Sequence, residues 1–550
     1  MDSELFMKLV MVVIYLLITL YLGYKGWKET KVAKDYLVAG RSMGAFVMAM
    51  SYGATFISTS AIIGFGGAAA MFGFSLLWLT FLNIFVGIFI AFVVFGKRVR
   101  LMGLALDTHT FPELIGRRYR SVFLQGFAGA IIFIFLPIYA GAVLIGLARL
   151  IEVYLGVNYY AALLGCSFLM ALYVLTGGLK AVMYTDAFQG CLMFIIMAVF
   201  LVATYWLLGG VVPAHTALTD MVKYYPESLK KIGMVGWTQG AVPGSPIWLT
   251  IYTTIVLGVG IGVLAQPQLA VRFMTIKSEQ QLKRAVMYGG VFILCMTGVA
   301  FVVGALTNAI FFQKMGMLDK VVDGVAKQVP AISVVVAGGN IDKIIPTYIE
   351  KFFPPWFSML FVLAMFAAAM STLSAQYHAG GTSFGRDFYE KGLRAKGDTL
   401  MVTRVGVGLT ILFTLLWGIF LPGSIIALAT AFFFGLCSSS FLPVLILGLY
   451  WRGITRVGAV SSMVGGFLIS TLYAIFIHQK EATALGLSNL LFGSATLVTG
   501  YPAGSWMWKL QFVDQNVIAM PCALLIAVIV SFVTPKMDKA YVDRCFKNIS

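Results

Sequence analysis

Small and hydroxyl-bearing residues interrupt an apolar stretch between Phe366 and Asp387, FAAAMSTLSAQYHAGGTSFGRD. On a continuous helix the carbonyl of Ala368 and the hydroxyls of Ser371 and Thr372 lie at positions i, i+3 and i+4, which share one face. A hard cation such as Na+ accepts carbonyl and hydroxyl oxygens as ligands and needs no carboxylate. The alternative is that both hydroxyls donate to carbonyls three or four residues earlier, as is common in membrane helices. These residues alone leave both interpretations open.

The composition indicates that the elements holding such a site lie in a membrane. The 550 residues are 60% hydrophobic and 11% charged, and the mean hydropathy of +0.92 excludes a soluble protein. Apolar runs long enough to cross a bilayer recur along the chain, and we count about 13 transmembrane helices. The six cysteines form neither a disulfide framework nor a metal-ligand spacing, and we expect no organic cofactor. The sequence therefore predicts an all-α polytopic membrane protein.

The distribution of basic residues predicts how the chain crosses its membrane. About 27 of the 39 Lys and Arg residues, among them Arg272, fall in loops on one side, which the positive-inside rule assigns to the cytoplasm. We therefore expect a multi-pass plasma-membrane protein with its amino terminus outside and its carboxyl terminus in the cytoplasm. The net charge of +17 then reflects topology and attraction to anionic lipid. The expected partners are the bilayer and a small-molecule substrate, with no nucleic acid and no obligatory protein.

The order of the spans predicts two related halves. Spans 2–6 and 7–11 form consecutive groups of five, and an odd number of spans inverts the second group relative to the first, as in many secondary transporters. The first helix of each group is interrupted, at Ser51–Ser60 in one and at Gly258–Gly262 with Pro267 in the other. Matching breaks indicate a binding site near the middle of the membrane. The alternative is close helix packing at small residues.

These repeats divide the chain into five parts. Residues 1–45 form a lead helix and a cytoplasmic loop, 46–208 the first repeat, 209–247 an extracellular loop, 248–451 the second repeat, and 452–550 two peripheral helices and a cytoplasmic tail. The tail is too short for a signalling domain, which argues against a membrane sensor. The four histidines are too scattered to form the acid–base constellation of an intramembrane enzyme. We therefore expect a protein that transports and catalyses no reaction.

Three motifs occur in order along these spans. They are GGLKAV with YTDAFQ (177–182 and 184–189), QP with RFM (266–267 and 272–274), and AMST with RD (369–372 and 386–387). Together they resemble the sodium:solute symporter family, and the resemblance covers nearly the whole chain. It implies the five-plus-five inverted-repeat fold of bacterial amino-acid transporters, with one span before the repeats and two after them. It also implies a symporter that works by alternating access, with Na+ as the coupling ion.

Carried over residue by residue, the resemblance implies a sodium site with five oxygen ligands. The carbonyls of Ala54 and Ile57, from the first broken helix, join the carbonyl of Ala368 and the hydroxyls of Ser371 and Thr372. The unwound helix supplies the ligands that one helix alone lacks. The resemblance therefore favours the ion site over hydrogen bonds within one helix.

The resemblance also implies a role for Asp186, which matches an acidic residue on the family's inner sodium path. A carboxylate at the centre of a membrane helix costs about 2.5–3.5 kcal/mol, so a functional role would explain its presence. The alternative is a helix N-cap at the membrane surface, held by Lys180.

The residues around the breaks predict a compact substrate. The candidate binding residues are Thr55, Phe56, Ser58, Tyr139, Gly258 and Ile261. Phe56 stands where the family's bacterial proline carriers have an acidic residue, and helix ends suit a carboxylate. The sequence therefore predicts import of a monocarboxylate such as acetate, pyruvate or lactate, with one Na+ per substrate and no net charge moved. The alternative is a sodium/proline, other amino-acid or pantothenate symporter of the same fold.

Overall fold

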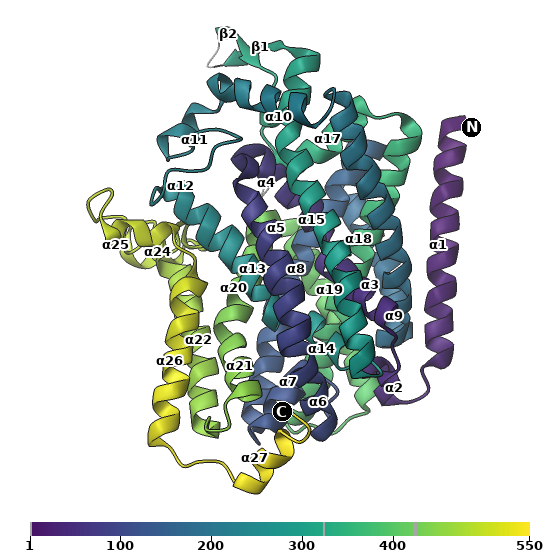
Figure 1. Cartoon of the computed structure of the whole chain (residues 1–550), viewed down its shortest axis with the longest axis vertical. Helices are drawn as coiled ribbons and strands as arrows, with labels where there is room; N and C mark the ends of the chain where they lie inside the picture. The colour runs from purple at the N-terminus through teal and green to yellow at the C-terminus, as the bar shows by residue number, and fades with distance from the viewer. Residues whose placement is uncertain (1–2, 323–324, 422–425, 550) are drawn as a thin grey trace.

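The computed structural model describes residues 3–322, 325–421 and 426–549, and long helices running side by side form most of it (Figure 1). One antiparallel hairpin departs from the all-α prediction, formed by β1 (Met317–Val322) and β2 (Val325–Pro330). The hairpin lies beyond the helical bundle, at the end opposite the carboxyl terminus (Figure 1). The membrane-spanning part of the described chain is therefore helical, as predicted.

Ten helices of the described chain are long and apolar enough to cross a membrane. A bent pair, α20 (Ile426–Ser440) and α21 (Leu442–Tyr450), makes an eleventh. Two further apolar segments, Ala45–Phe56 and Tyr159–Phe168, are shorter than this length. About ten spans are thus established, whereas the count of about 13 and the inverted repeat stay predictions.

The first half of the bundle contains α3 (Ala45–Phe56), η2 (Ser60–Gly64), α4 (Phe65–Phe72), η3 (Gly73–Leu76), α5 (Leu77–Ile84), η4 (Phe85–Gly96), α6 (Lys97–Ala105), α7 (Phe111–Arg118), α8 (Val122–Leu155) and α9 (Tyr159–Leu207). Within α9 the chain bends at Gly178, where φ is +63°. Only glycine adopts this conformation without strain, and a Cβ there would lie 2.6 Å from the ring of Tyr36. The bend starts a second helical segment, which carries Asp186 in its interior.

The second half contains η6 (Thr250–Gly258), α13 (Val259–Gly262), η7 (Val263–Ala265), α14 (Pro267–Phe273), α15 (Glu279–Met315), α16 (Ser333–Val336), η8 (Ile341–Lys343), α17 (Ile344–Phe352), α18 (Pro355–Thr382), η9 (Ser383–Gly392) and α19 (Thr399–Phe420), followed by α20 and α21. Helix α18 carries Ser371 and Thr372 and is almost entirely buried. It packs against α8, α9 and α3. Residues from both halves therefore meet around α18.

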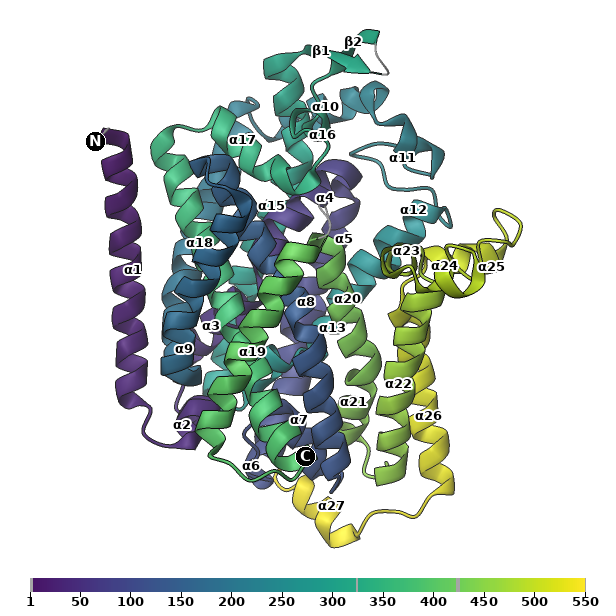
Figure 2. The ribbon, with the colours of Figure 1, turned by 180° about the vertical axis from the view of Figure 1, so that it is seen from behind.

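The remaining elements lie at the edges. They are α1 (Ser3–Glu29), α2 (Ala33–Val38) and η1 (Ala39–Arg41); α10 (Val211–Asp220), η5 (Met221–Tyr224), α11 (Glu227–Lys231) and α12 (Pro246–Leu249); α22 (Arg456–Phe476), α23 (Gln479–Leu485), α24 (Leu487–Phe492), α25 (Trp506–Lys509), η10 (Leu510–Phe512), α26 (Gln515–Val533) and α27 (Lys539–Cys545). Helix α1 stands at one edge of the bundle, and the packed pair α22 and α26 stands at the opposite edge (Figures 1 and 2).

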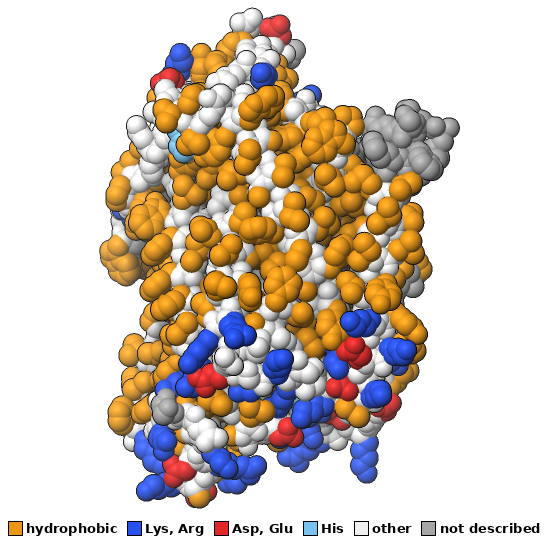
Figure 3. Space-filling view, turned by 45° about the vertical axis from the view of Figure 1, so that its right-hand side comes forward, with side chains coloured by type: hydrophobic (Ala, Val, Ile, Leu, Met, Phe, Trp, Pro, Cys, Tyr) orange, Lys and Arg blue, Asp and Glu red, His pale blue; other side chains and the backbone are white. Residues whose placement is uncertain are grey.

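Charge is distributed unevenly between the two ends of the molecule. Hydrophobic side chains cover the middle of the face seen in Figure 3, and Lys and Arg side chains gather at its lower end. Figure 1 places the carboxyl terminus and α27 at that same end. This surface has the apolar band and the basic flank that a protein crossing a bilayer needs.

Both predicted helix breaks exist, and the second is confined to the Pro267 end of the predicted segment. Helix α3 ends at Phe56, Ile57 is extended with φ −88° and ψ 97°, and the chain is helical again from Ser60. In the second half the chain stays helical through Gly258–Gly262 and breaks at Gln266, with φ −67° and ψ 119°. Pro267 then begins α14, because its fixed φ suits a first helical position.

The glycines of 258–262 allow close packing instead of unwinding. A Cβ on Gly262 would lie 2.4 Å from the carbonyl oxygen of Phe434, and one on Gly260 would lie 2.8 Å from Leu82. The predicted interruption at Gly258–Gly262 with Pro267 is therefore confirmed at Pro267 and wrong within the glycine segment, where the packing alternative holds. The break itself belongs to the Gln266–Pro267 pair.

Candidate functional site

The end of α3 meets the middle of α18 in a cluster of buried oxygens. The hydroxyl of Ser371 donates to the carbonyl of Ala54 at 2.9 Å and also lies 2.8 Å and 3.2 Å from the carbonyl oxygens of Ala367 and Ala368. A hydroxyl carries one hydrogen, so it satisfies one of these three acceptors at a time. The last carbonyls of α3 have no donors within their own helix. The cluster is thus rich in acceptors and poor in donors.

Thr372 extends the same cluster. Its hydroxyl donates to the carbonyl of Thr55 at 3.0 Å and lies 3.4 Å from that of Ala54. The structure thus brings Ala54, Ala368, Ser371 and Thr372 together, whereas Ile57 begins the extended segment that leaves the helix end. If the two hydroxyls turn their hydrogens away, every group in the cluster presents an oxygen, as a dehydrated monovalent cation requires.

Asp186 adjoins this cluster through Thr55 and is completely buried. Its Oδ2 accepts from the hydroxyl of Ser51 at 2.7 Å and from that of Thr55 at 3.3 Å. Its Oδ1 has no hydrogen-bond partner among the described residues. The N-cap alternative is wrong, because Asp186 lies inside the helical segment after Gly178 and Lys180 pairs with Asp35 at 3.7 Å.

The partner of Asp186 is Arg272, which the charge pattern placed in a cytoplasmic loop. The guanidinium is completely buried and donates to Oδ2 of Asp186 at 2.8 Å. It also donates to the hydroxyls of Thr55 at 2.5 Å and Ser51 at 2.9 Å. Arg272 therefore joins α14 to α3 and α9 directly beside the oxygen cluster. The sequence showed the motif that contains Arg272, but it did not show that this side chain is buried.

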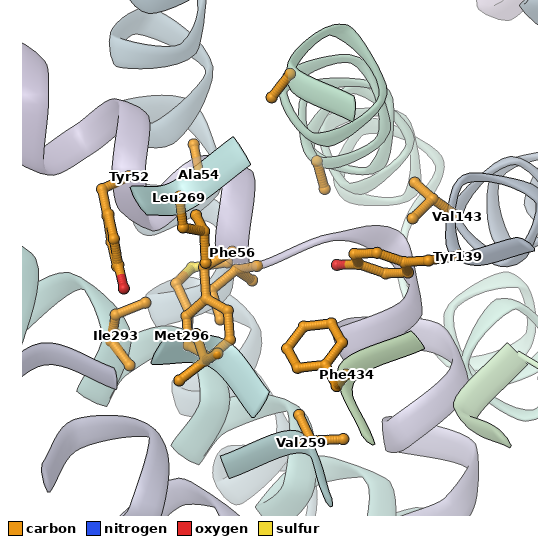
Figure 4. Close-up of a cluster of buried hydrophobic side chains, with 14 of the residues drawn as sticks. Tyr52, Ala54, Phe56, Tyr139, Val143, Val259, Leu269, Ile293, Met296 and Phe434 are labelled. Atoms are coloured by element: carbon orange, nitrogen blue, oxygen red, sulfur yellow. The ribbon is translucent and has the colours of Figure 1, made fainter. Parts of the chain in front are cut away.

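A cavity of about 20 Å³ lies on the other side of the break. Three of the predicted substrate residues line it: Phe56, Ser58 and Tyr139. In Figure 4 the hydroxyl of Tyr139 points toward Phe56, and the ring of Phe434 lies beside it, with ring centroids 5.3 Å apart. The cavity holds little more than one water molecule, so it is too small for an organic substrate unless its walls move.

Val259, within the predicted segment 258–261, also lines the cavity, but the sequence did not single out Asn83, Thr430 and Phe434. Asn83 is buried, and its Oδ1 has no hydrogen-bond partner among the described residues. The polar carboxamide of Asn83 within the apolar run of α5 and η4 was the feature of the sequence that could have identified this residue. The described residues that line the cavity carry no charge.

The other three predicted substrate residues lie elsewhere in the structure. Thr55 faces Asp186 and Arg272. A Cβ on Gly258 would lie 3.3 Å from Nδ2 of Asn516, which places this glycine against α26. Ile261 is partly exposed. Of this group, the structure brings only Phe56, Ser58 and Tyr139 to the described wall of the cavity.

Comparisons with known proteins show the family and the fold of this chain. A model of the sodium:solute symporter family matches residues 36–466. Sodium/proline symporter 2 of Staphylococcus saprophyticus is 27% identical over 511 residues, and the sodium/proline symporter of Staphylococcus aureus is 27% identical over 509 residues; both alignments cover 90% of each chain. A substrate-bound, outward-open Na+-coupled sialic acid symporter has a similar fold, with a TM-score of 0.72 at 17% identity over 96% of this chain and 99% of that one.

Proposed function

The chain belongs to the sodium:solute symporter family, and we propose that it imports a compact amino acid, such as proline, together with Na+. Sodium binds at the carbonyls of Ala54, Ile57 and Ala368 and the hydroxyls of Ser371 and Thr372. It leaves toward the cytoplasm past Asp186. The acceptor-rich cluster between α3 and α18 supports this site.

The choice of substrate rests on Oδ1 of Asn83, which lies at the cavity and has no hydrogen-bond partner among the described residues. The ammonium group of proline donates two hydrogens and gives this oxygen a partner, while the hydroxyl of Tyr139, which also bonds Ser58, can donate to the carboxylate. A monocarboxylate has no N–H donor and leaves the amide oxygen unpaired, at a cost of about 1–3 kcal/mol. The aromatic rings of Phe56 and Phe434 suit an apolar pyrrolidine ring. The names of the two staphylococcal relatives point the same way.

Import of a monocarboxylate is the second candidate, and one observation favours it. The described lining contains no acidic side chain to pair with a full ammonium charge. A lining without acidic side chains is compatible with acetate, pyruvate or lactate. The two candidates differ in the charge that they move.

We further propose that the basic end of the molecule faces the cytoplasm of a plasma membrane. The gathering of Lys and Arg at the end that holds the carboxyl terminus supports this orientation, because positive loops remain inside. The amino terminus is then outside. Residues 46–208 and 248–451 act as the two repeats that move around the site.

Uptake into proteoliposomes tests the function directly. We expect labelled proline to accumulate only with an inward sodium gradient, whereas acetate, pyruvate, lactate, pantothenate and galactose do not. With one Na+ per zwitterion, a tenfold gradient and 100 mV together supply about 3.7 kcal/mol, or about 500-fold accumulation. One Na+ with a monocarboxylate supplies about 1.4 kcal/mol, or about tenfold, and moves no charge. Sustained inward current with proline on a solid-supported membrane supports the proposal. Sodium-driven uptake of a monocarboxylate alone overturns the choice of substrate.

Substitution of Asn83 tests whether its side-chain oxygen binds the substrate. We expect Asn83→Ala to raise the KM for proline about tenfold, because the ammonium loses its acceptor. The matched control is Thr430→Val in the same cavity, since the Thr430 hydroxyl already donates to the Ile426 carbonyl at 2.8 Å. An unchanged KM in Asn83→Ala would remove Asn83 from the substrate site.

A further inference from the structure

A second buried polar cluster lies where α26 begins, away from the sodium cluster. Asp514 caps this helix through Oδ1, which accepts from the backbone N–H of Asn516 at 2.9 Å. Its own backbone N–H donates to the hydroxyl of Thr253 on η6 at 2.9 Å. Asp514, Gln515 and Asn516 are each at most 3% exposed. The start of a membrane helix ordinarily lies at the membrane surface, whereas the start of α26 is buried inside the protein.

Two glycines make room for this cluster. A Cβ on Gly435 of α20 would lie 3.2 Å from Oδ1 of Asp514 and 3.3 Å from Nε2 of Gln515. A Cβ on Gly258 of η6 would lie 3.3 Å from Nδ2 of Asn516 and 3.7 Å from Oδ2 of Asp514. The carboxylate thus lies between the backbones of two core helices, with both of its oxygens close to glycine.

Hydrogen bonding in this recess is incomplete. Both amide atoms of Gln515 and Nδ2 of Asn516 have no partner among the described residues. Buried polar groups are nearly always paired, so unpaired groups gathered at one place indicate a function or a bound species. Simple capping of α26 explains Oδ1 of Asp514 but leaves these amides unexplained.

Titratable groups approach the recess from the neighbouring helices. His478 is 2% exposed and pairs through Nδ1 with Glu481 of α23. Tyr473 of α22 also faces Asp514, and its hydroxyl donates to the carbonyl of Leu510 at 2.8 Å. Lys480 lies beside Glu481, while η6 and α20 present threonine and glycine. The recess therefore combines two carboxyl groups with one imidazole.

One carboxyl group of this cluster, that of Asp514, titrates near physiological pH. Burial raises the pKa of the Asp514 carboxyl to about 7, although the charge of His478 opposes this effect. The pKa of His478 is raised, because attraction to Glu481 outweighs burial. Since the pKa of Asp514 is raised, acidification through neutral pH adds a proton to it and removes the cost of a buried charge.

Neighbouring residues of the chain contact the recess and line the substrate cavity. Gly258 and Gly435 face the cluster, and their chain neighbours Val259 and Phe434 line the cavity. A change in the packing of α26 against Gly258 and Gly435 therefore displaces Val259 and Phe434, which form two walls of the cavity.

We propose that Asp514, with His478 and Glu481, forms an extracellular proton-binding site that controls access to the substrate cavity. The proposal rests on the proposed function and orientation. A neutral Asp514 fits the dry recess and favours the closed arrangement of η6 and α20. An ionised Asp514 favours hydration of the recess and opening of these two walls.

The test is sodium-driven proline uptake by proteoliposomes at external pH values from about 5.5 to 8.5, with internal pH fixed. The ionised fraction of a single group rises from about one tenth to nine tenths over the two pH units around its midpoint. We therefore expect initial uptake by the wild type to rise up to about ninefold through neutral pH. Asp514→Asn keeps the helix cap, because asparagine caps as well as aspartate. It should remove the pH step and hold uptake at the low, acidic rate.

His478→Gln provides the second readout. Loss of the positive imidazolium leaves the negative Glu481 near Asp514, so the midpoint should move upward by about half a pH unit or more. Glu227→Gln is the control, because Glu227 pairs with Lys230 on exposed α11. A wild-type step that survives in Asp514→Asn, or an unmoved midpoint in His478→Gln, overturns the site. Wild-type protein without sodium-driven uptake would instead overturn the proposed function.

Discussion

Replacing Ser371 and Thr372 together by alanine should abolish sodium-driven uptake while leaving a folded protein. The double substitution removes two of the five proposed sodium ligands. At about 1.4 kcal/mol for each ligand, the apparent affinity for Na+ should fall about 100-fold. The hydroxyls also donate to the carbonyls of Ala54 and Thr55 at the end of α3, so stability should fall as well, by about 1–3 kcal/mol for each carbonyl left unpaired. The measurement is the sodium dependence of substrate binding by purified protein.

The matched control is the double substitution Ser358→Ala and Thr382→Ala on the same helix. Both hydroxyls donate to carbonyls, Ser358 to Pro354 at 3.3 Å and Thr382 to Ala379 at 3.1 Å. The control should bind Na+ like the wild type. If Ser371→Ala with Thr372→Ala also binds Na+ normally, the two hydroxyls serve only to cap α3.

Breaking the ion pair between Asp186 and Arg272 should produce the second large effect. Arg272→Gln leaves a buried carboxylate without its counter-charge, which costs about 3–5 kcal/mol. Asp186→Asn leaves the guanidinium unpaired but keeps an acceptor for Ser51 and Thr55. We expect Asp186→Asn to lower the maximal rate of transport more than it weakens substrate binding, because this carboxylate lies on the proposed sodium exit. Thermal unfolding and uptake rates measure the two effects separately.

The double variant Asp186→Asn with Arg272→Gln separates structure from transport. Removing both charges should restore much of the thermal stability, because neither charge is left alone in the interior. It should not restore the transport rate. Arg118→Gln serves as the control, since Arg118 is also buried but donates to the carbonyl of Gly448. A normal maximal rate in Asp186→Asn would make this residue a structural partner of Arg272 only.

Local composition and spacing were enough to predict several properties of this protein. Apolar runs of helical length established a polytopic membrane protein. The small and hydroxyl-bearing residues at 51–60 marked the break of α3, because such residues neither favour nor stabilise a continuous helix. The spacing of Ala368, Ser371 and Thr372 placed them on one face of α18. In each case residues a few positions apart carried the necessary information.

Which of these faces meet could not be predicted from local spacing and became visible in the packed helices. Arg272 belongs to a basic loop by sequence but becomes the buried partner of Asp186, 86 positions away. Gly258 was expected at the substrate but faces α26, and Asn83 was overlooked but lines the cavity. The second break falls at Gln266, because the glycines before it pack against Phe434 and Leu82. Helical spacing determines which residues share a face of a helix. The packing of distant segments determines what that face contacts, so local sequence could not predict it.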